Sequence, residues 1–177
     1  GSMTQVETSK IAGEDFDEEI IKYLRTKRGL LVGIRTAEDI KKSIGSAIMR
    51  EEDVIASASG RDVLTGLPKT IEVTGNEIYE CLKPLLDILA ETAVTMFERT
   101  APQLVTDITD SGILITGGSS DLYGIDKMFS NALHIDAHIA PQANLCVAKG
   151  ASIALRKMNV LDNYGYRFKT KEDVRIR

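Results

Sequence analysis

Apolar residues recur along the chain at two spacings, and the two spacings alternate. Helical spacing, with apolar residues three or four positions apart, predicts helices over about 15–27, 36–46, 76–99, 125–132 and 144–158, and a short helix that begins near Pro102. Alternating or continuous apolar character predicts strands over 5–11, 54–59, 69–74, 112–116 and 135–140. Strands interleaved with helices indicate an α/β fold.

Local signals add detail to these elements. Thr36, followed three residues later by Asp39, predicts a capping box for the second helix. Pro84 lies inside the long helix, where it removes a backbone hydrogen bond, so we expect a kink or a break near Cys81. The continuous apolar run of 112–116 is typical of a buried strand.

The segment 60–68 separates two predicted strands and is punctuated by glycine and proline. Gly60, Gly66 and Pro68 favour a turn. We therefore expect a β-hairpin, which would form the body of a small subdomain.

Composition narrows the classes of partner. The chain has 177 residues and 43% apolar content, enough for one domain or a domain with a small insert. Its net charge of −4, with both signs interspersed, and its 5% aromatic content argue against nucleic-acid binding. No apolar run approaches the ~20 residues of a membrane-spanning helix. Residues 1–3 look like a tag scar, and no signal peptide is evident.

A glycine loop follows the apolar strand of 112–116. Gly117 and Gly118 let the backbone approach a ligand closely, and Ser119 leads toward the next helix, whose free N–H groups suit an anion or a nucleotide. In open α/β sheets, ligands bind beyond the carboxyl ends of strands. An ordinary strand-to-helix turn is the alternative interpretation.

Glu38 and Lys41 lie three residues apart and share one face of the second helix. A carboxylate can accept hydrogen bonds from ribose hydroxyls, and an ammonium can pack over a base or donate to it. The alternative is a solvated ion pair within the helix.

The histidines and cysteines predict little chemistry. His134 and His138 would share one face of a strand, but no third metal ligand is nearby, so we expect no metal site. Cys81 and Cys146 fall in apolar helical patterns, which predicts buried thiols rather than a disulfide. The sequence offers no complete hydrolytic set, so no catalytic residue is predicted.

Several segments, taken in order, resemble one protein family. They are IAGEDFDEEI at 11–20, GIRTAE at 33–38 with IK at 40–41 and IG at 44–45, GRD at 60–62 with TGLPKTI at 65–71, TDI at 106–108 with GILITGG at 112–118, and CVAKG at 146–150. Over about residues 9–161 the chain resembles the second lobe of MreB-type bacterial actins, the rod-shape-determining proteins. The same lobe occurs more distantly in actin and in Hsp70-type ATPases.

The resemblance implies an α/β fold of the actin-like ATPase type, a ribonuclease-H-like lobe with a small α+β subdomain inserted. The larger subdomain would comprise 4–34 and 76–161, and the smaller one 35–75. Residues 162–177 would follow as a tail.

The resemblance also implies ligand roles, with ATP and Mg²⁺ as the cofactors of the full-length protein. Glu38 and Lys41 would hold the ribose and adenine side, and Gly117 and Gly118 would line the adenosine and phosphate region. Gly13 would lie close to the sugar and phosphates.

The loop departs from the family pattern at two positions. Ser119, which we include among the cofactor-binding residues, stands where the family usually has a third glycine. Asp121 stands where an apolar residue is common. A negative charge near phosphates is unfavourable unless its side chain points to solvent.

The family grips ATP with two Gly-rich, Asp-containing phosphate loops, and neither is found in this chain. We therefore expect that the chain by itself is not an enzyme, because phosphoryl transfer depends on handling the γ-phosphate and its Mg²⁺. We also expect two central strands of the family's sheet to be absent from this chain. An open sheet edge invites another chain, so we expect pairing with a second copy, a segment swap, or coverage of the gap by the tail.

The resemblance implies self-association into filaments and work with cell-shape and wall-synthesis proteins, in the cytoplasm at the inner face of the membrane. Membrane contact would go through the other lobe. An alternative is a protein-interaction module that no longer binds nucleotide, favoured by the missing loops and by Ser119 and Asp121. A chaperone ATPase lobe of the Hsp70 type is a further alternative, but it would need a substrate-binding domain after the lobe.

Overall fold

The computed structural model describes residues 4–163 and Gly165. Its helices are α1 (Gly13–Lys27), α2 (Ile34–Ile44), α3 (Gly75–Glu98), α4 (Pro102–Ser111), α5 (Ile125–Leu133), α6 (Cys146–Arg156) and α7 (Met158–Asn163), with two 3-10 turns, η1 (Gly118–Asp121) and η2 (Ala143–Leu145). Its strands are β1 (Leu30–Leu31), β2 (Ile55–Asp62), β3 (Pro68–Thr74), β4 (Ile113–Ile115) and β5 (Ala137–Ile139). Contacts divide the chain into two units after Asn144.

An antiparallel sheet in the order β1-β2-β3 lies in the first unit. The β2–β3 hairpin runs in register from Ile55 opposite Thr74 to Arg61 opposite Pro68, and it confirms the two strands predicted around 60–68. The two-residue strand β1 was not predicted, because so short a pairing leaves no periodicity to detect.

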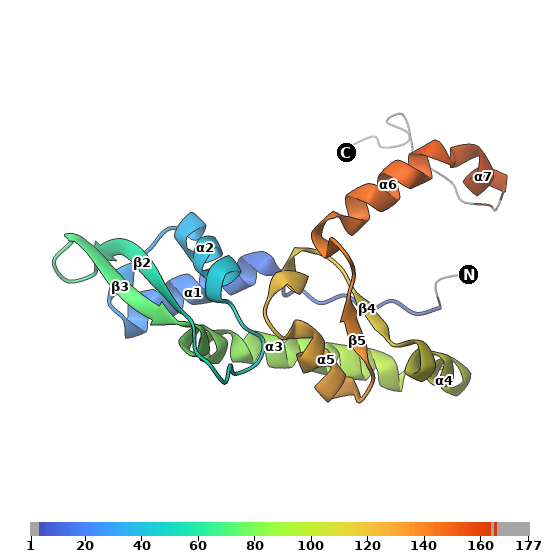
Figure 1. Cartoon of the computed structure of the whole chain (residues 1–177), viewed down its shortest axis with the longest axis horizontal. Coiled ribbons are helices and arrows are strands. Elements are labelled where there is room, and N and C mark those ends of the chain that lie inside the picture. The colour runs from blue at the N-terminus through green and yellow to red at the C-terminus, as the bar shows by residue number, and fades with distance from the viewer. Residues whose placement is uncertain (1–3, 164, 166–177) are drawn as a thin grey trace. The chain divides into compact units, whose positions relative to one another are not determined.

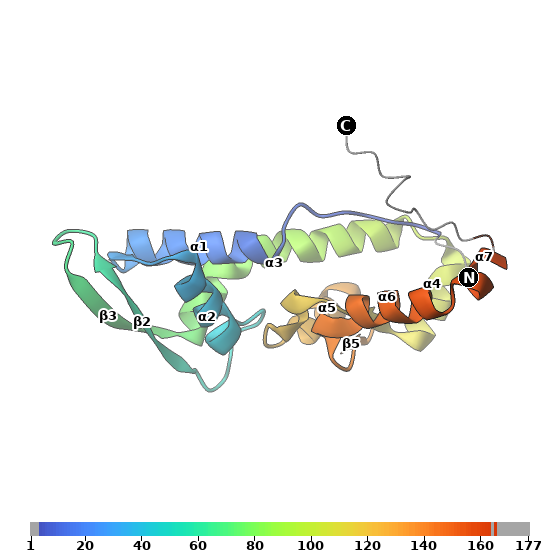
Figure 2. The same cartoon turned by 90° about the horizontal axis from the view of Figure 1, so that it is seen from above.

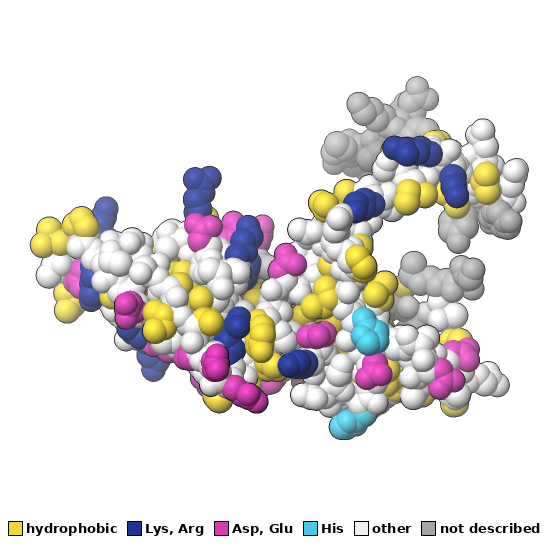
Figure 3. Space-filling view, in the orientation of Figure 1, with side chains coloured by type: hydrophobic (Ala, Val, Ile, Leu, Met, Phe, Trp, Pro, Cys, Tyr) yellow, Lys and Arg dark blue, Asp and Glu magenta, His cyan; other side chains and the backbone are white. Residues whose placement is uncertain are grey.

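The main core of the first unit lies between α1, α2, α3 and the hairpin (Figure 1). In Figure 2, α1 and α3 run alongside one another, and α2 crosses near the hairpin. The apolar stripes of these elements meet in the core, whose largest fully buried apolar side chains are Phe16, Ile20, Leu24, Leu30, Ile78, Leu82, Leu86 and Val73. Acidic and basic side chains are interspersed over the surface in Figure 3.

Of the kink or break expected near Cys81, the break is wrong, because the long helix α3 continues through Pro84; the kink stays a prediction. Pro84 is exposed, whereas Leu82 and Leu86 on either side of it are buried. Packing of these neighbours stabilises the helix on both sides of the proline, which outweighs the single lost hydrogen bond.

Strands β4 and β5 form a parallel pair with Ile113 opposite Ala137. The strand at 112–116 was expected to be buried, but Leu114 is 66% exposed. The reason is that, among the described residues, β4 pairs with β5 alone, which leaves one edge and part of a face uncovered. Residues 5–11 were expected to form a strand and do not.

Helix boundaries near the end of the chain also differ from expectation. The predicted helix of 144–158 is divided into η2, α6 and α7. Of the predicted tail, 162 and 163 end α7, and the remainder, apart from Gly165, lies outside the described residues, as does the tag scar at 1–3. None of the described helices combines the length and the apolar character needed to cross a membrane.

Candidate functional site

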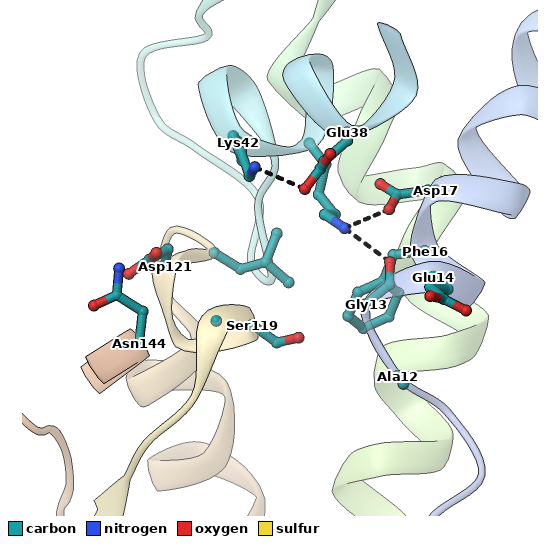
Figure 4. A pocket seen from close by; sticks show the side chains of 13 residues that line it. Ala12, Gly13, Glu14, Phe16, Asp17, Glu38, Lys42, Ser119, Asp121 and Asn144 are labelled. Carbon is teal, nitrogen blue, oxygen red and sulfur yellow. Dashed lines mark hydrogen bonds and ion pairs between the residues drawn. The ribbon is translucent and has the colours of Figure 1, made fainter. Parts of the chain in front are cut away.

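A cavity of about 610 Å³ opens in the first unit where α1, α2 and η1 meet (Figure 4). Small-molecule sites commonly have volumes of about 300–1,000 Å³. The lining residues are Ala12, Gly13, Glu14, Phe16, Asp17, Glu38, Lys41, Lys42, Gly118, Ser119, Asp121, Leu122 and Asn144.

Five of the six residues predicted to bind the cofactor line this cavity: Gly13, Glu38, Lys41, Gly118 and Ser119. They come from three elements that are far apart in the sequence. The sixth residue, Gly117, is not among the lining residues. It begins the η1 turn with a φ of 102°, and its N–H donates to the carbonyl oxygen of Ala143 over 2.9 Å. Ligand binding by these residues remains a prediction.

Lys41 crosses from α2 to α1. Its Nζ donates to the carbonyl oxygen of Gly13 and to Oδ2 of Asp17, both over 2.8 Å (Figure 4). The two charged side chains are only 14% and 7% exposed, respectively. Sequence reasoning missed Asp17, although a signal was available. Asp17 shares the apolar stripe of α1 with Ile20 and Leu24, where an acid is out of place.

Glu38 pairs with Lys42, not with Lys41. The Lys42 Nζ lies 2.7 Å from Glu38 Oε1, and both side chains are substantially exposed. The hydrogen bond from Lys42 and its positive charge lower the pKa of the Glu38 carboxyl. The ion pair suggested as an alternative therefore exists with a different partner, and it leaves the Glu38 carboxylate accessible from the cavity.

The second helix also begins differently from the prediction. The capping box of Thr36 and Asp39 is wrong, because α2 starts at Ile34 with Gly33 as its N-cap and no side-chain cap. The helix is shifted by two residues toward the N-terminus, from 36–46 to Ile34–Ile44, and keeps the predicted length. This shift does not change which face carries Glu38 and Lys41.

Gly13 lies close to side chains from both other walls of the cavity. A Cβ atom added to Gly13 would lie 3.5 Å from Lys41 Nζ and 3.7 Å from Ser119 Oγ. The start of α1 at this point is fixed by Asp15, whose Oδ2 accepts from the backbone N–H of Ala12 over 2.6 Å. Gly13 on α1 therefore lies close to both Lys41 on α2 and Ser119 on η1.

The η1 wall is held by a buried serine and carries an acid near its end. Ser120 is 3% exposed, and its hydroxyl donates to the carbonyl oxygen of Gly117 over 2.6 Å. Asp121 is exposed, and it lies beside Asn144 on the opposite side of the cavity from Asp17 (Figure 4).

The η1 wall is fastened to the end of α2. The N–H of Ala47 donates to the carbonyl oxygen of Tyr123 over 2.8 Å, and the N–H of Tyr123 donates to that of Gly45 over 3.3 Å. Arg50 stacks over the Tyr123 ring, 3.8 Å from its centroid. A Cβ atom on Gly45 would clash with the backbone carbonyl oxygen of Lys41 and lie 2.7 Å from Leu122 Cδ2, so only glycine fits at this approach. These contacts join the η1 wall of the cavity to the C-terminal end of α2.

The histidines do not form a pair. His134 ends α5 with a φ of 55°, whereas His138 lies in β5, so the prediction that both lie on one strand face is wrong. No group of metal-ligating side chains occurs within the described ranges. Neither cysteine forms a disulfide. Cys81 is buried, as predicted, whereas Cys146, which was also predicted to be buried, is only half-buried.

A family model described as MreB/Mbl protein matches residues 1–163. The cell shape-determining protein Mbl of Bacillus cereus is 40% identical over 163 residues, which cover 90% of this chain and 49% of that protein. The cell shape-determining protein MreB of Escherichia coli is 34% identical over 151 residues, covering 85% and 44%. The chain thus spans about half the length of the curated relatives it matches.

Solved structures of actin-like proteins also match this chain. MreB5 of Spiroplasma citri bound to ADP matches with a TM-score of 0.81 and 32% identity, over 86% of this chain and 47% of that one. The same protein bound to AMPPNP also gives 0.81. A MamK double helical filament matches with a TM-score of 0.58 at 17% identity, over 78% and 44%, which supports the fold alone. These matches confirm the predicted actin-like fold.

Proposed function

Because the chain belongs to the MreB/Mbl family, we propose that it supplies the nucleoside-binding half of an ATP site in an actin-type, filament-forming protein that determines cell shape. The chain spans about half of its relatives' length, so ATP, Mg²⁺ and filament formation all belong to the proposal. In the whole protein, a second lobe would close over the nucleotide from the other side.

One observation carries this proposal: five residues predicted from the sequence to bind a nucleotide converge on one cavity of suitable volume. They reach it from α1, α2 and η1, which are separated along the chain by stretches of core residues. A relative at 32% identity was solved with ADP and with AMPPNP. These facts together favour a nucleotide over other ligands of similar size.

The chemistry of the cavity suits a nucleoside better than a triphosphate. Glu38 offers an accessible acceptor and Lys41 a donor, while Gly118 has no side chain to obstruct a flat base. Glu14 and Asp121 add negative charge to the lining, which is unfavourable beside phosphate oxygens. We therefore propose that the phosphates and Mg²⁺ are held mainly from outside this cavity.

It follows that the chain by itself should not hydrolyse ATP, since stabilising the transferred phosphoryl group is the main catalytic task. Phosphate release from Mg-ATP by the purified chain should stay at the level of a buffer blank. Turnover that copurifies with the chain through successive columns would contradict this part of the proposal.

Isothermal titration calorimetry with Mg-ATP tests the nucleoside site directly. We expect saturable binding that Glu38→Ala weakens at least fivefold. Glu80→Ala, which removes an exposed glutamate from α3, is the matched control and should bind as the unmodified chain does. Absence of binding by the unmodified chain would reject the nucleoside site in this chain.

Filament formation has a candidate surface at the end of the β2–β3 hairpin. Val63, Leu64 and Leu67 are 47%, 94% and 65% exposed there, and apolar side chains gather at this end in Figure 3. Exposed apolar clusters commonly mark protein contacts. We propose that they contribute to contacts between successive copies, in a filament at the inner face of the membrane that works with cell-shape and wall-synthesis proteins.

A second candidate function is a protein-interaction module that binds no nucleotide. The observation favouring it is an apolar groove of about 550 Å³ beside β4, whose walls include Met96, Phe97, Leu114 and Phe129. A chain that shows no heat with Mg-ATP but associates through this groove would support the module instead.

A further inference from the structure

The ammonium group of Lys41 is held at two of its three N–H donors. One donates to the carbonyl oxygen of Gly13 and one to Asp17 Oδ2, each over 2.8 Å (Figure 4). A lysine ammonium has three donors and no acceptor. Since Lys41 lines the cavity, its third donor remains for a group inside the cavity.

The buried position of Asp17 is unfavourable for its own carboxylate. Its residue is 5% exposed, and its second carboxylate oxygen, Oδ1, is buried without a hydrogen-bond partner. Burying a carboxylate with an unpaired oxygen is unfavourable, and a buried ion pair is weak evidence for stability. What the aspartate does provide is a fixed place for the Lys41 ammonium, whose flexible stem would otherwise sample many rotamers.

The pairing also selects the kind of ligand group that Lys41 meets. The charge of Asp17, at 2.8 Å, largely offsets that of Lys41, so the remaining donor attracts a phosphate less than an unpaired lysine would. A neutral acceptor suits it better. Glu38 lines the same cavity with an accessible carboxylate. A sugar hydroxyl can accept from the lysine, and it or its neighbour can donate to the glutamate.

We propose that Asp17 is a positioning residue that aims the third N–H of Lys41 at a sugar hydroxyl of the nucleotide and so makes the site selective for ribonucleotides over deoxyribonucleotides. This inference rests on the proposed nucleoside site. Asp17 acts through Lys41 and, with Oδ1 buried, needs no contact with the ligand.

The test compares discrimination rather than affinity alone. Dissociation constants for ATP, 2′-deoxy-ATP and 3′-deoxy-ATP, all with Mg²⁺, are measured by calorimetry for the unmodified chain and for Asp17→Asn. We expect the unmodified chain to bind ATP at least fivefold more tightly than one of the deoxy analogues. Asp17→Asn should weaken ATP binding at least fivefold, while binding of that analogue changes less than twofold.

A second variant controls for misfolding, because Asp17→Asn leaves the Lys41 ammonium buried without its counter-charge. Asp17→Asn combined with Lys41→Gln removes both charges, and it should fold, as judged by circular dichroism, and bind ATP and the analogue equally. If either variant still discriminates as the unmodified chain does, or weakens all three ligands by one factor, the positioning role is overturned and the nucleoside site stands. If the unmodified chain binds ATP and both deoxy analogues equally, the positioning role is likewise overturned and the nucleoside site stands. If it binds no nucleotide, the proposed site and this inference fall together.

Discussion

Thr74 and Glu77 cap the start of α3 reciprocally. The N–H of Glu77 donates to Thr74 Oγ1 over 3.2 Å, and the N–H of Thr74 donates to Glu77 Oε2 over 3.0 Å. The other carboxylate oxygen of Glu77 accepts from the Tyr23 hydroxyl over 3.2 Å and pairs with Arg28. A single glutamate therefore joins the end of the hairpin, the start of α3 and the last turns of α1.

Removing this glutamate should destabilise the first unit more than removing the threonine. Thr74→Ala should cost about 1 kcal/mol of unfolding free energy, as loss of a helix cap does. Glu77→Ala should cost about 2 kcal/mol, because it also leaves the partly buried Arg28 without its counter-charge. Urea unfolding followed by circular dichroism measures both. A Glu77→Ala loss no larger than that of Glu80→Ala would contradict the linking role.

The hairpin turn should be sensitive to acid. Asp62 Oδ1 accepts from the N–H groups of Leu64 and Thr65, and Oδ2 pairs with Lys69 over 2.9 Å. The hydrogen bond from the Thr65 backbone, followed by those from Lys69 and Leu64, holds the pKa of the Asp62 carboxyl far below its ordinary value. A folded pKa below the unfolded one stabilises the fold above the unfolded pKa, and this contribution is lost as the pH falls toward the folded pKa.

A carbon-detected NMR titration checks this expectation. The Asp62 carboxyl should titrate at a lower pH in the folded chain than in an unstructured peptide of residues 60–70. Lys69→Met should raise its midpoint toward that of the peptide. Equal midpoints in chain and peptide would show that the turn does not hold the carboxylate.

Gly45 should tolerate no larger residue. A Cβ atom there would lie 2.2 Å from the carbonyl oxygen of Lys41 as well as 2.7 Å from Leu122. Gly45→Ala should therefore cost about 2 kcal/mol or more, as overpacking does. Gly118→Ala is the control, since nothing lies within 4 Å of its added Cβ, and it should change stability by only a few tenths of a kcal/mol. Thermal melts of the two variants that coincide would refute the close approach.

The two cysteines should differ in reactivity. Burial, with a smaller effect from Glu19, raises the pKa of the Cys81 thiol to about 12, and its Sγ lies 3.4 Å from the carbonyl oxygen of Glu19. The thiolate is the reactive form, so iodoacetamide at pH 8 should modify Cys146 well before Cys81. Peptide mass spectrometry measures the order, and the two rates should converge in urea. Preferential modification of Cys81 in the folded chain would be inconsistent with its burial.

The uncovered edge of β4 should promote association between copies of this chain. Leu114 is 66% exposed on β4, and open strand edges pair readily. Multi-angle light scattering should show dimers or larger species at micromolar concentration, and Leu114→Lys should shift them toward the monomer. Leu64→Lys at the hairpin end is the comparison. A monomer at every concentration would contradict the prediction, and dissociation by Leu64→Lys alone would move the contact to the hairpin.

The sequence predicted those helices and strands in which apolar residues recur on one face over several turns or alternations. α1, α3 and the β2–β3 hairpin have several turns or alternations each, and their apolar faces meet in the core. The two-residue strand β1 escaped detection, and 5–11 was predicted as a strand from its alternation although no strand among the described residues pairs with it. Tertiary packing also overrode a local signal at Pro84.

Residues of the candidate site could be predicted where they belong to a sequence motif. They could not be predicted where only the packing of two helices brings them together. Gly13, Glu38, Lys41 and the Gly118 loop follow from family-like segments that the fold brings together. The partner of Lys41 required knowledge of how α1 faces α2, which no spacing within α2 supplies. The acid at 17 in an otherwise apolar stripe was the one clue available.

The junction of Gly45 with Leu122 and of Ala47 with Tyr123 has a kinetic consequence. If a ligand binds in this cavity, walls joined in this way would need little ordering, so we expect the complex to form at a rate set by diffusion and orientation rather than by rearrangement. Differences in affinity between ligands would then reside in how long each one stays.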